Sequence, residues 1–194
     1  MCMTALESKN KLILGNERFI TGNPAVKDIG ENKRRDLSLK GQHPFAVILC
    51  CSDSRVPPEI IFDQGLGELF VIRTAGNVAD DVVLGSIEYG AEHLEIPLIV
   101  VLGHEKCGAV KAAVEAEGDV RGCIKSITDK IGKSYDKVRG SRNACEACED
   151  ENIRDTVADI KNNKVIARLI KEGKTEVIGA KYAIETGVVM FYSE

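Results

Sequence analysis

The sequence has no tryptophan, and aromatic residues make up only 5% of its 194 residues. It also has no long apolar segment. The longest uninterrupted run, Ile96–Leu102, is far shorter than the roughly 20 residues that a membrane-spanning helix needs. The N-terminus has no basic flank followed by an apolar stretch, so we expect no secretion signal and a cytoplasmic location.

Neither sign of charge dominates the chain. The sequence has 26 lysines and arginines against 30 aspartates and glutamates, which gives a formal net charge of −4. This balance gives no electrostatic reason to expect nucleic acid or an anionic membrane as a partner. With 44% hydrophobic and 29% charged residues, the composition is typical of one soluble domain over residues 1–194.

Three apolar segments, 44–51, 69–72 and 97–102, show no alternation of polar and apolar residues. This pattern is typical of strands buried on both faces, as in a parallel sheet. Two short strands are expected within 174–192. Helices are expected over 5–20, 79–94, 107–117 and 153–170. The polar segment 32–39 is expected to be a helical connector.

Strands that alternate with helices predict an α/β fold. We expect a mainly parallel central β-sheet flanked by helices, with a C-terminal strand pair. Gly173 is placed to end the last helix. Residues 118–151 are polar and charged and give no clear pattern.

The number of cysteines is odd, and no secretion signal accompanies them. A disulfide framework is therefore disfavoured, and metal binding or catalysis is favoured for some of them. The seven are Cys2, Cys50, Cys51, Cys107, Cys123, Cys145 and Cys148.

Two of the predicted strands end in residues that can bind a metal. The first ends in Cys51-Ser-Asp-Ser-Arg55 and the third in Gly-His104-Glu-Lys-Cys107-Gly108. Ligands collect at the carboxyl ends of parallel strands, so Cys51, His104 and Cys107 can converge there. Two thiolates and one imidazole, with a fourth position left to water, form a known catalytic zinc pattern. Buried structural cysteines are the competing interpretation.

These motifs resemble those of the β-class carbonic anhydrases. The resemblance covers most of the chain, because the segments 14–19, 67–77, 86–89 and 179–187 also fit the family. It implies zinc on Cys51, His104 and Cys107, and reversible hydration of carbon dioxide to bicarbonate and a proton through zinc-bound hydroxide.

The resemblance also implies that Asp53 and Arg55 act as a catalytic pair. Asp53 would orient the hydroxide, and Arg55 would hold Asp53 away from the metal by a bidentate contact. A surface ion pair is the competing interpretation. Two thiolates offset the charge of zinc, so we expect the pKa of its water to lie above the value of about 7 found with three histidines.

Four positions match the family's substrate pocket: Gln42, Phe70, Tyr89 and the backbone N–H of Gly108. Parts of this pocket come from a neighbouring subunit in the family. The resemblance therefore implies a homodimer or higher homo-oligomer, with the N-terminal helix packing on a partner subunit. His93, four residues after Tyr89, is a candidate for proton transfer.

Another branch of the family has an inhibitory bicarbonate site that uses a tryptophan ahead of the first cysteine. Ile48 stands at that place here, so we expect an open metal site. Cys123, Cys145 and Cys148 have no known family role. They are expected to be free surface thiols, with a second metal site or a redox switch as the alternatives.

Two other functions stay open at this point. The first is a related zinc hydrolase that acts on carbon disulfide or carbonyl sulfide. The second is a non-catalytic zinc or redox binding module. A dinucleotide-binding protein is disfavoured, because no Gly-x-Gly-x-x-Gly follows the first strand.

Overall fold

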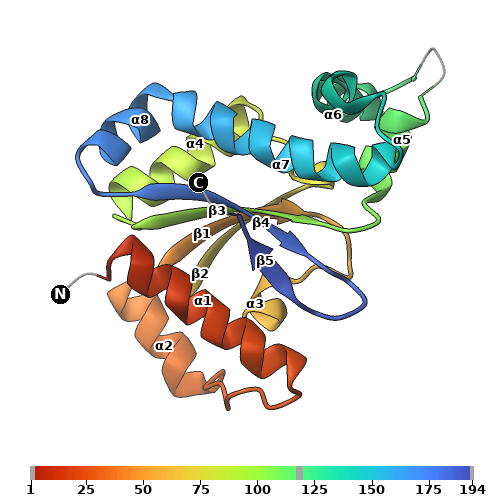
Figure 1. The fold of residues 1–194 in the computed structure, drawn as a ribbon. Coiled ribbons are helices and arrows are strands. Elements are labelled where there is room, and N and C mark those ends of the chain that lie inside the picture. The colour runs from red at the N-terminus through yellow and green to blue at the C-terminus, as the bar shows by residue number, and fades with distance from the viewer. Residues whose placement is uncertain (1–2, 117–119, 193–194) are drawn as a thin grey trace.

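Five strands form one sheet in the order β2-β1-β3-β4-β5 in the computed structural model, which describes residues 3–116 and 120–192 (Figure 1). Strands β1 to β4 pair in parallel, and β5 pairs antiparallel with β4. The predicted parallel sheet and C-terminal strand pair are confirmed. The strands are β1 (Ala46–Cys51), β2 (Leu69–Thr74), β3 (Leu98–His104), β4 (Glu176–Tyr182) and β5 (Val189–Phe191).

Helices lie on both faces of this sheet (Figure 1). One side carries α1 (Ala5–Ile20), α2 (Glu31–Lys40) and α3 (Pro58–Ile61). The other side carries α4 (Asp81–Glu88), α7 (Ala144–Asn162) and α8 (Lys164–Lys171). Beyond the carboxyl end of β3 lie α5 (Gly108–Val114) and α6 (Ile124–Val138).

The sheet is buried on both faces, as its apolar strands predict. In β1, Ile48 and Cys50 join the core beneath α1, whereas Val47 and Leu49 join the core beneath α4, α7 and α8. A third cluster of buried residues lies at the carboxyl end of the sheet and contains Cys51 and Cys107. The predicted metal ligands therefore belong to a packed region.

The helix boundaries follow from local capping. Thr4 and Glu7 form a capping box at the start of α1, which covers the predicted range 5–20. The prediction of a single helix over 153–170 is wrong, because Asn163 separates α7 from α8. Asn163 has extended backbone angles, and its side chain accepts hydrogen bonds from Val165 N and Ile166 N. An asparagine caps a new helix more readily than it continues one.

Other predicted boundaries shift by a few residues. The helix expected over 107–117 is α5, which ends at Val114, and Glu117 lies outside the described residues, as does Cys2. The helix expected over 79–94 is α4 followed by a π-helical turn, η2 (Tyr89–His93). The part of 118–151 that the structure describes holds α6 and the first turns of α7. Across 3–116 and 120–192, no helix combines the length and apolar character that crossing a bilayer requires.

The close approach of α1 to α3 depends on Gly15. A Cβ added at Gly15 would lie 1.8 Å from the carbonyl oxygen of Phe62, a backbone atom that cannot turn away. We expect Gly15→Ala to lower the free energy of unfolding by about 1–3 kcal/mol, measured by urea denaturation.

The matched control for this prediction is Gly85→Ala, in α4. A Cβ at Gly85 meets nothing within 4 Å, so this change should be neutral or stabilise the helix by up to about 1 kcal/mol. Equal effects of the two substitutions would contradict the assigned role of Gly15.

Candidate metal centre

Three potential ligands converge at the carboxyl end of the sheet. Cys51 is the last residue of β1, His104 is the last residue of β3, and Cys107 is the N-cap of α5. Their ligand atoms all lie within 4.8 Å of one another, and all three residues are buried. Two sulfur atoms and one nitrogen at this spacing suit a tetrahedral metal that keeps one open position.

The imidazole of His104 is oriented for metal binding. Its Nδ1 lies 2.8 Å from the carbonyl oxygen of Glu105, which can only accept, so Nδ1 carries the hydrogen. Its Nε2 is buried and has no hydrogen-bond partner. A buried nitrogen lone pair without a partner is costly, and a cation held between the imidazole and the two thiols would satisfy it.

The two thiols also favour a cation. Their contact lowers the pKa of Cys51 and, with burial, raises the pKa of Cys107. One thiolate therefore forms readily, whereas the second needs a neighbouring positive charge to offset the repulsion between them. Burial raises the pKa of Cys50 to about 12, which is typical of a structural thiol.

Asp53 and Arg55 form a bidentate pair beside these ligands. Arg55 Nε donates to Asp53 Oδ1 at 3.0 Å, and Arg55 Nη2 donates to Asp53 Oδ2 at 2.7 Å. The backbone N–H of Arg55 also donates to Oδ1. The guanidinium holds the pKa of Asp53 well below its usual range, so the carboxylate stays ionised at neutral pH. Asp53 does not belong to the group of converging ligand atoms found among the described residues.

Two neighbours of Cys51 take part that the sequence pattern did not assign to the site. Arg73 donates to the carbonyl oxygens of Cys51 and Asp53 at 2.7–3.1 Å. The N–H of Gly76 donates to Cys51 Sγ at 3.3 Å. Gly76 has φ +71° in the turn η1 (Ala75–Asn77), a conformation that favours glycine. Every residue except proline has a backbone N–H donor, so side-chain patterns could not reveal this one.

A further contact reaches Cys107 from α7. Glu149 Oε1 accepts a hydrogen bond from the backbone N–H of Cys107 at 3.2 Å. Glu149 lies in the part of the sequence that gave no clear pattern. Its own neighbourhood in the sequence is polar, which is equally typical of a solvated helix face.

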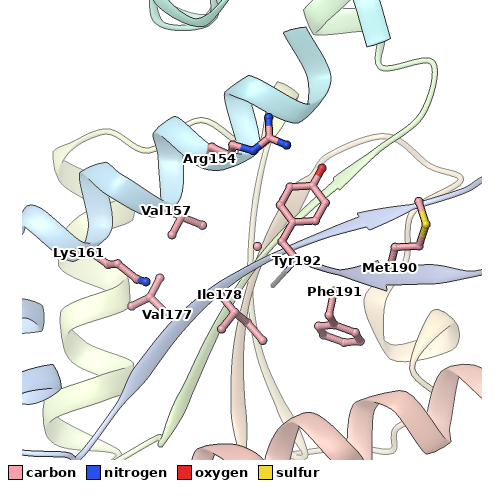
Figure 2. A pocket seen from close by; sticks show the side chains of 9 residues that line it. Arg154, Val157, Lys161, Val177, Ile178, Met190, Phe191 and Tyr192 are labelled. Atoms are coloured by element: carbon pink, nitrogen blue, oxygen red, sulfur yellow. The ribbon is translucent and has the colours of Figure 1, made fainter. Parts of the chain in front are cut away.

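Space is open around parts of the centre. Gly108 is exposed, and a Cβ built on it would meet nothing within 4 Å. A cavity of about 550 Å³ borders Cys107 and Glu149. A second cavity, of about 500 Å³, lies between α7 and the strands β4 and β5 (Figure 2). None of the predicted site residues lines this second cavity, so the candidate centre lies elsewhere.

The other predicted pocket residues lie away from these ligands. Phe70 pairs with Val47 near the start of β1, and Thr74 pairs with Cys51 at its end. Thr74 lies four positions after Phe70 in the strand, which corresponds to about 13 Å. The Phe70 ring packs on Tyr89 at 6.1 Å between centroids, and Tyr89 packs on the exposed His93 at 5.4 Å. Gln42 is exposed in the loop that leads into β1.

The remaining cysteines divide by burial. Cys123 is exposed and Cys145 is half-buried, but Cys148 is fully buried, so the expectation of a surface thiol is wrong for Cys148. It packs in the same cluster as Cys51 and Cys107 because α7 lies over this end of the sheet. Within residues 3–116 and 120–192, the one potential metal group is Cys51, His104 and Cys107.

Comparison with known proteins gives consistent matches. The family model described as carbonic anhydrase matches residues 46–189. The carbonic anhydrase of Mycolicibacterium smegmatis is 42% identical over 180 residues, covering 90% of this chain and 87% of the relative. Carbonic anhydrase 2 of Mycobacterium tuberculosis is also 42% identical over 180 residues, covering 89% and 86%. The structure of the Coccomyxa β-carbonic anhydrase in complex with acetazolamide matches with a TM-score of 0.75 and 27% identity, covering 84% of this chain and 79% of that one.

The electrostatic role of Arg55 is open to direct measurement. Arg55→Ala removes the bidentate donor, so the pKa of Asp53 should rise toward the usual range for aspartate. Titration of the carboxyl carbon-13 shift of Asp53 would measure this change.

Arg139→Ala is the control for that measurement. Arg139 pairs with Asp136 on the surface, and the substitution should leave the titration of Asp53 unchanged. An Asp53 pKa that is equal in the native protein and in Arg55→Ala would contradict the role given to the guanidinium.

Proposed function

Since this chain belongs to the β-class carbonic anhydrase family, we propose that Cys51, His104 and Cys107 hold one zinc ion at which carbon dioxide is reversibly hydrated. The chain is a carbonic anhydrase, a lyase that interconverts carbon dioxide and water with bicarbonate and a proton. The observation that carries the zinc proposal is the convergence of two thiols and an unpartnered imidazole nitrogen beside an Asp–Arg pair.

Zinc suits this donor set, since sulfur and nitrogen ligands in a tetrahedral arrangement are those it prefers. When bound, it lowers the pKa of a coordinated water, which supplies a nucleophile near neutral pH. The chain's own contribution is the negative charge of its two thiolates. Two thiolates offset the formal charge of the ion, so the pKa of that water should lie above the value of about 7 that is typical of three-histidine sites.

Asp53 is the group that orients the nucleophile in this proposal. Its carboxylate can accept a hydrogen bond and so direct a lone pair toward the carbon of the substrate. Arg55 holds the carboxylate through two side-chain contacts, which keeps it from swinging onto the metal. The low pKa of Asp53 means that it remains an acceptor throughout the neutral and alkaline range.

After Asp53, the second group proposed to contact the substrate is the backbone N–H of Gly108. Its backbone N–H lies at the first position of α5, where the orphan donors of a helix attract negative charge. Gly108 is exposed, and a Cβ built on it would meet nothing within 4 Å, which supports its assignment to the substrate. Bicarbonate carries the negative charge that such a donor stabilises.

The rest of the pocket is proposed to come from a second copy of the chain. Phe70 and Tyr89 lie at the other end of the sheet from Cys51 in the same chain, so they can face this centre only across a subunit interface. The outer face of α1 supports this arrangement, because Leu6 and Leu14 are 65% and 54% exposed. The assignments of Gln42 to substrate and of His93 to proton transfer depend on the same interface.

The activity proposal can be tested by stopped-flow hydration of carbon dioxide, using protein of measured zinc content. The rate should far exceed that of buffer and should rise from pH 6 to pH 9 as the bound water ionises. Asp53→Asn should abolish most of the activity, by a factor of about 100 or more, because the amide cannot replace a directed carboxylate.

The control is Asp129→Asn, which removes an exposed carboxylate paired with Lys125 on α6 and should leave the rate unchanged. A flat rate between pH 6 and 9 would contradict the charge argument. Full activity in Asp53→Asn would contradict the role of Asp53 and favour a different use of the metal.

The shared pocket makes a separate prediction. Leu14→Glu places a charge on the outer face of α1, and it should shift the protein toward monomers and reduce activity in parallel. Sedimentation velocity and the hydration rate would be measured on the same samples.

Ile124→Glu serves as the control, since Ile124 is also exposed but lies on α6. It should retain both the assembly and the rate. A monomeric Leu14→Glu protein with native activity would show that one chain completes its own pocket.

A further inference from the structure

Helix α7 contacts the backbone beside both thiol ligands, although it supplies no ligand itself. At Cys107, Glu149 Oε1 accepts the backbone N–H at 3.2 Å. Near Cys51, Asn152 Nδ2 donates to the carbonyl oxygen of Gly76 at 2.8 Å. The N–H of the same Gly76 donates to Cys51 Sγ. One helix face therefore reaches the surroundings of both sulfur atoms.

Close packing places α7 at this position. A Cβ at Gly103 of β3 would lie 2.4 Å from Ile153 Cδ1, and a Cβ at Gly179 of β4 would lie 2.8 Å from Ile153 Cγ2. The two glycines thus leave room for Ile153 directly on the strands. Glu149 lies one helical turn before Ile153, so it meets the end of β3, where the ligands are.

Glu149 is fixed by a buried cation. Lys181 Nζ lies 3.0 Å from Glu149 Oε2 and 2.8 Å from Asp150 Oδ1, and the side chains of Lys181 and Glu149 are only 6% and 7% exposed. Burying these charges is costly unless they are paired and hydrogen-bonded. Lys181 stands on β4 opposite Gly103, next to His104. The ion pair between Lys181 and Glu149 therefore fixes the carboxylate that accepts the hydrogen bond from the Cys107 N–H.

The network extends to the end of the described chain. Tyr192 donates its hydroxyl to Asp150 Oδ1 at 2.7 Å, and Arg154 lies over the tyrosine ring at 5.5 Å. Figure 2 shows Tyr192 between the strands and α7, with its hydroxyl toward the helix. Glu149 and Asp150 thus each have a defined partner, which leaves Glu149 Oε1 for the Cys107 N–H.

We propose that Glu149 and Asn152 are positioning residues for the metal centre, which hold the backbone that carries the Cys107 and Cys51 thiolates. This inference rests on the proposed function, because it assumes that the two thiols bind the metal. Groups that orient metal ligands from outside the coordination sphere typically contribute a factor of about 10–100 to metal affinity. Glu149 fixes the start of α5 at Cys107, and Asn152 fixes the Gly76 donor to Cys51.

The test measures metal retention in the full chain rather than activity. Zinc release to a chromogenic chelator gives the dissociation rate, and cobalt(II) replacing zinc gives thiolate-to-metal absorption bands that report the geometry at sulfur. Glu149→Ala and Asn152→Ala should each release zinc about 10–100 times faster and should alter the cobalt bands.

A conservative rescue separates positioning from folding. In the double variant Glu149→Gln with Lys181→Met, the amide oxygen still accepts the Cys107 N–H, and both charges of the pair are removed together. Zinc release from this variant should lie within about threefold of the native rate. Glu151→Gln is the matched control on α7, since the half-buried Glu151 pairs with Lys137 and Arg154 and not with the backbone beside the thiols. It should release zinc at the native rate.

Native release rates and cobalt spectra in folded Glu149→Ala and Asn152→Ala would overturn the inference. So would release from the double variant as fast as from Glu149→Ala, because the buried charge pair and not the acceptor would then be responsible. If Glu149→Ala does not fold, Asn152→Ala decides alone. A native protein that binds no stoichiometric cobalt or zinc would instead overturn the proposed function, and this inference with it.

Discussion

The parallel pairing of β1 with β3 is the constraint on which the rest of the site depends. Cys50 pairs with Leu102, so the ends of the two strands lie side by side and bring Cys51 beside His104. A slip of one residue would move His104 by about 3.3 Å along the sheet and reverse the faces of the strand. After that change the three ligand atoms could no longer lie within 4.8 Å of one another. The continuous apolar runs that fix this register therefore also fix the relative positions of the three predicted ligands.

Charge around the centre is arranged in two layers. The inner layer holds two thiols that repel each other as thiolates and an imidazole nitrogen without a partner, so it favours a cation. The outer layer holds Asp53, whose carboxylate is neutralised by Arg55, and Arg73, whose guanidinium binds the carbonyl oxygens of the Cys51 loop. The two outer cations therefore hold the oxygens of Asp53 and of the Cys51 loop in fixed contacts.

The convergence of Cys51, His104 and Cys107 was predictable because all three lie at or just after the ends of apolar strands, where local pattern and tertiary position coincide. The parallel sheet, α1 and the terminal strand pair were predictable for the same reason. The Asn163 break was missed because helical periodicity continues on both sides of it. Glu149 was missed because Glu-Asp-Glu at 149–151 is typical of a solvated helix face. Only Lys181, a lone cation within the apolar strand β4, hinted that a buried carboxylate must lie opposite.

The proposed metal binding would be linked to folding through α7. Ile153 packs on Gly103 and Gly179, while Glu149 and Asn152, on either side of it in α7, touch the backbone beside the ligands. Undocking α7 would therefore expose core residues and release both contacts at once. Conversely, a metal held by Cys51, His104 and Cys107 would stabilise the docked helix, because metal affinity for the folded state adds to the free energy of unfolding. Retention of such a metal and integrity of the fold would therefore be a single cooperative property.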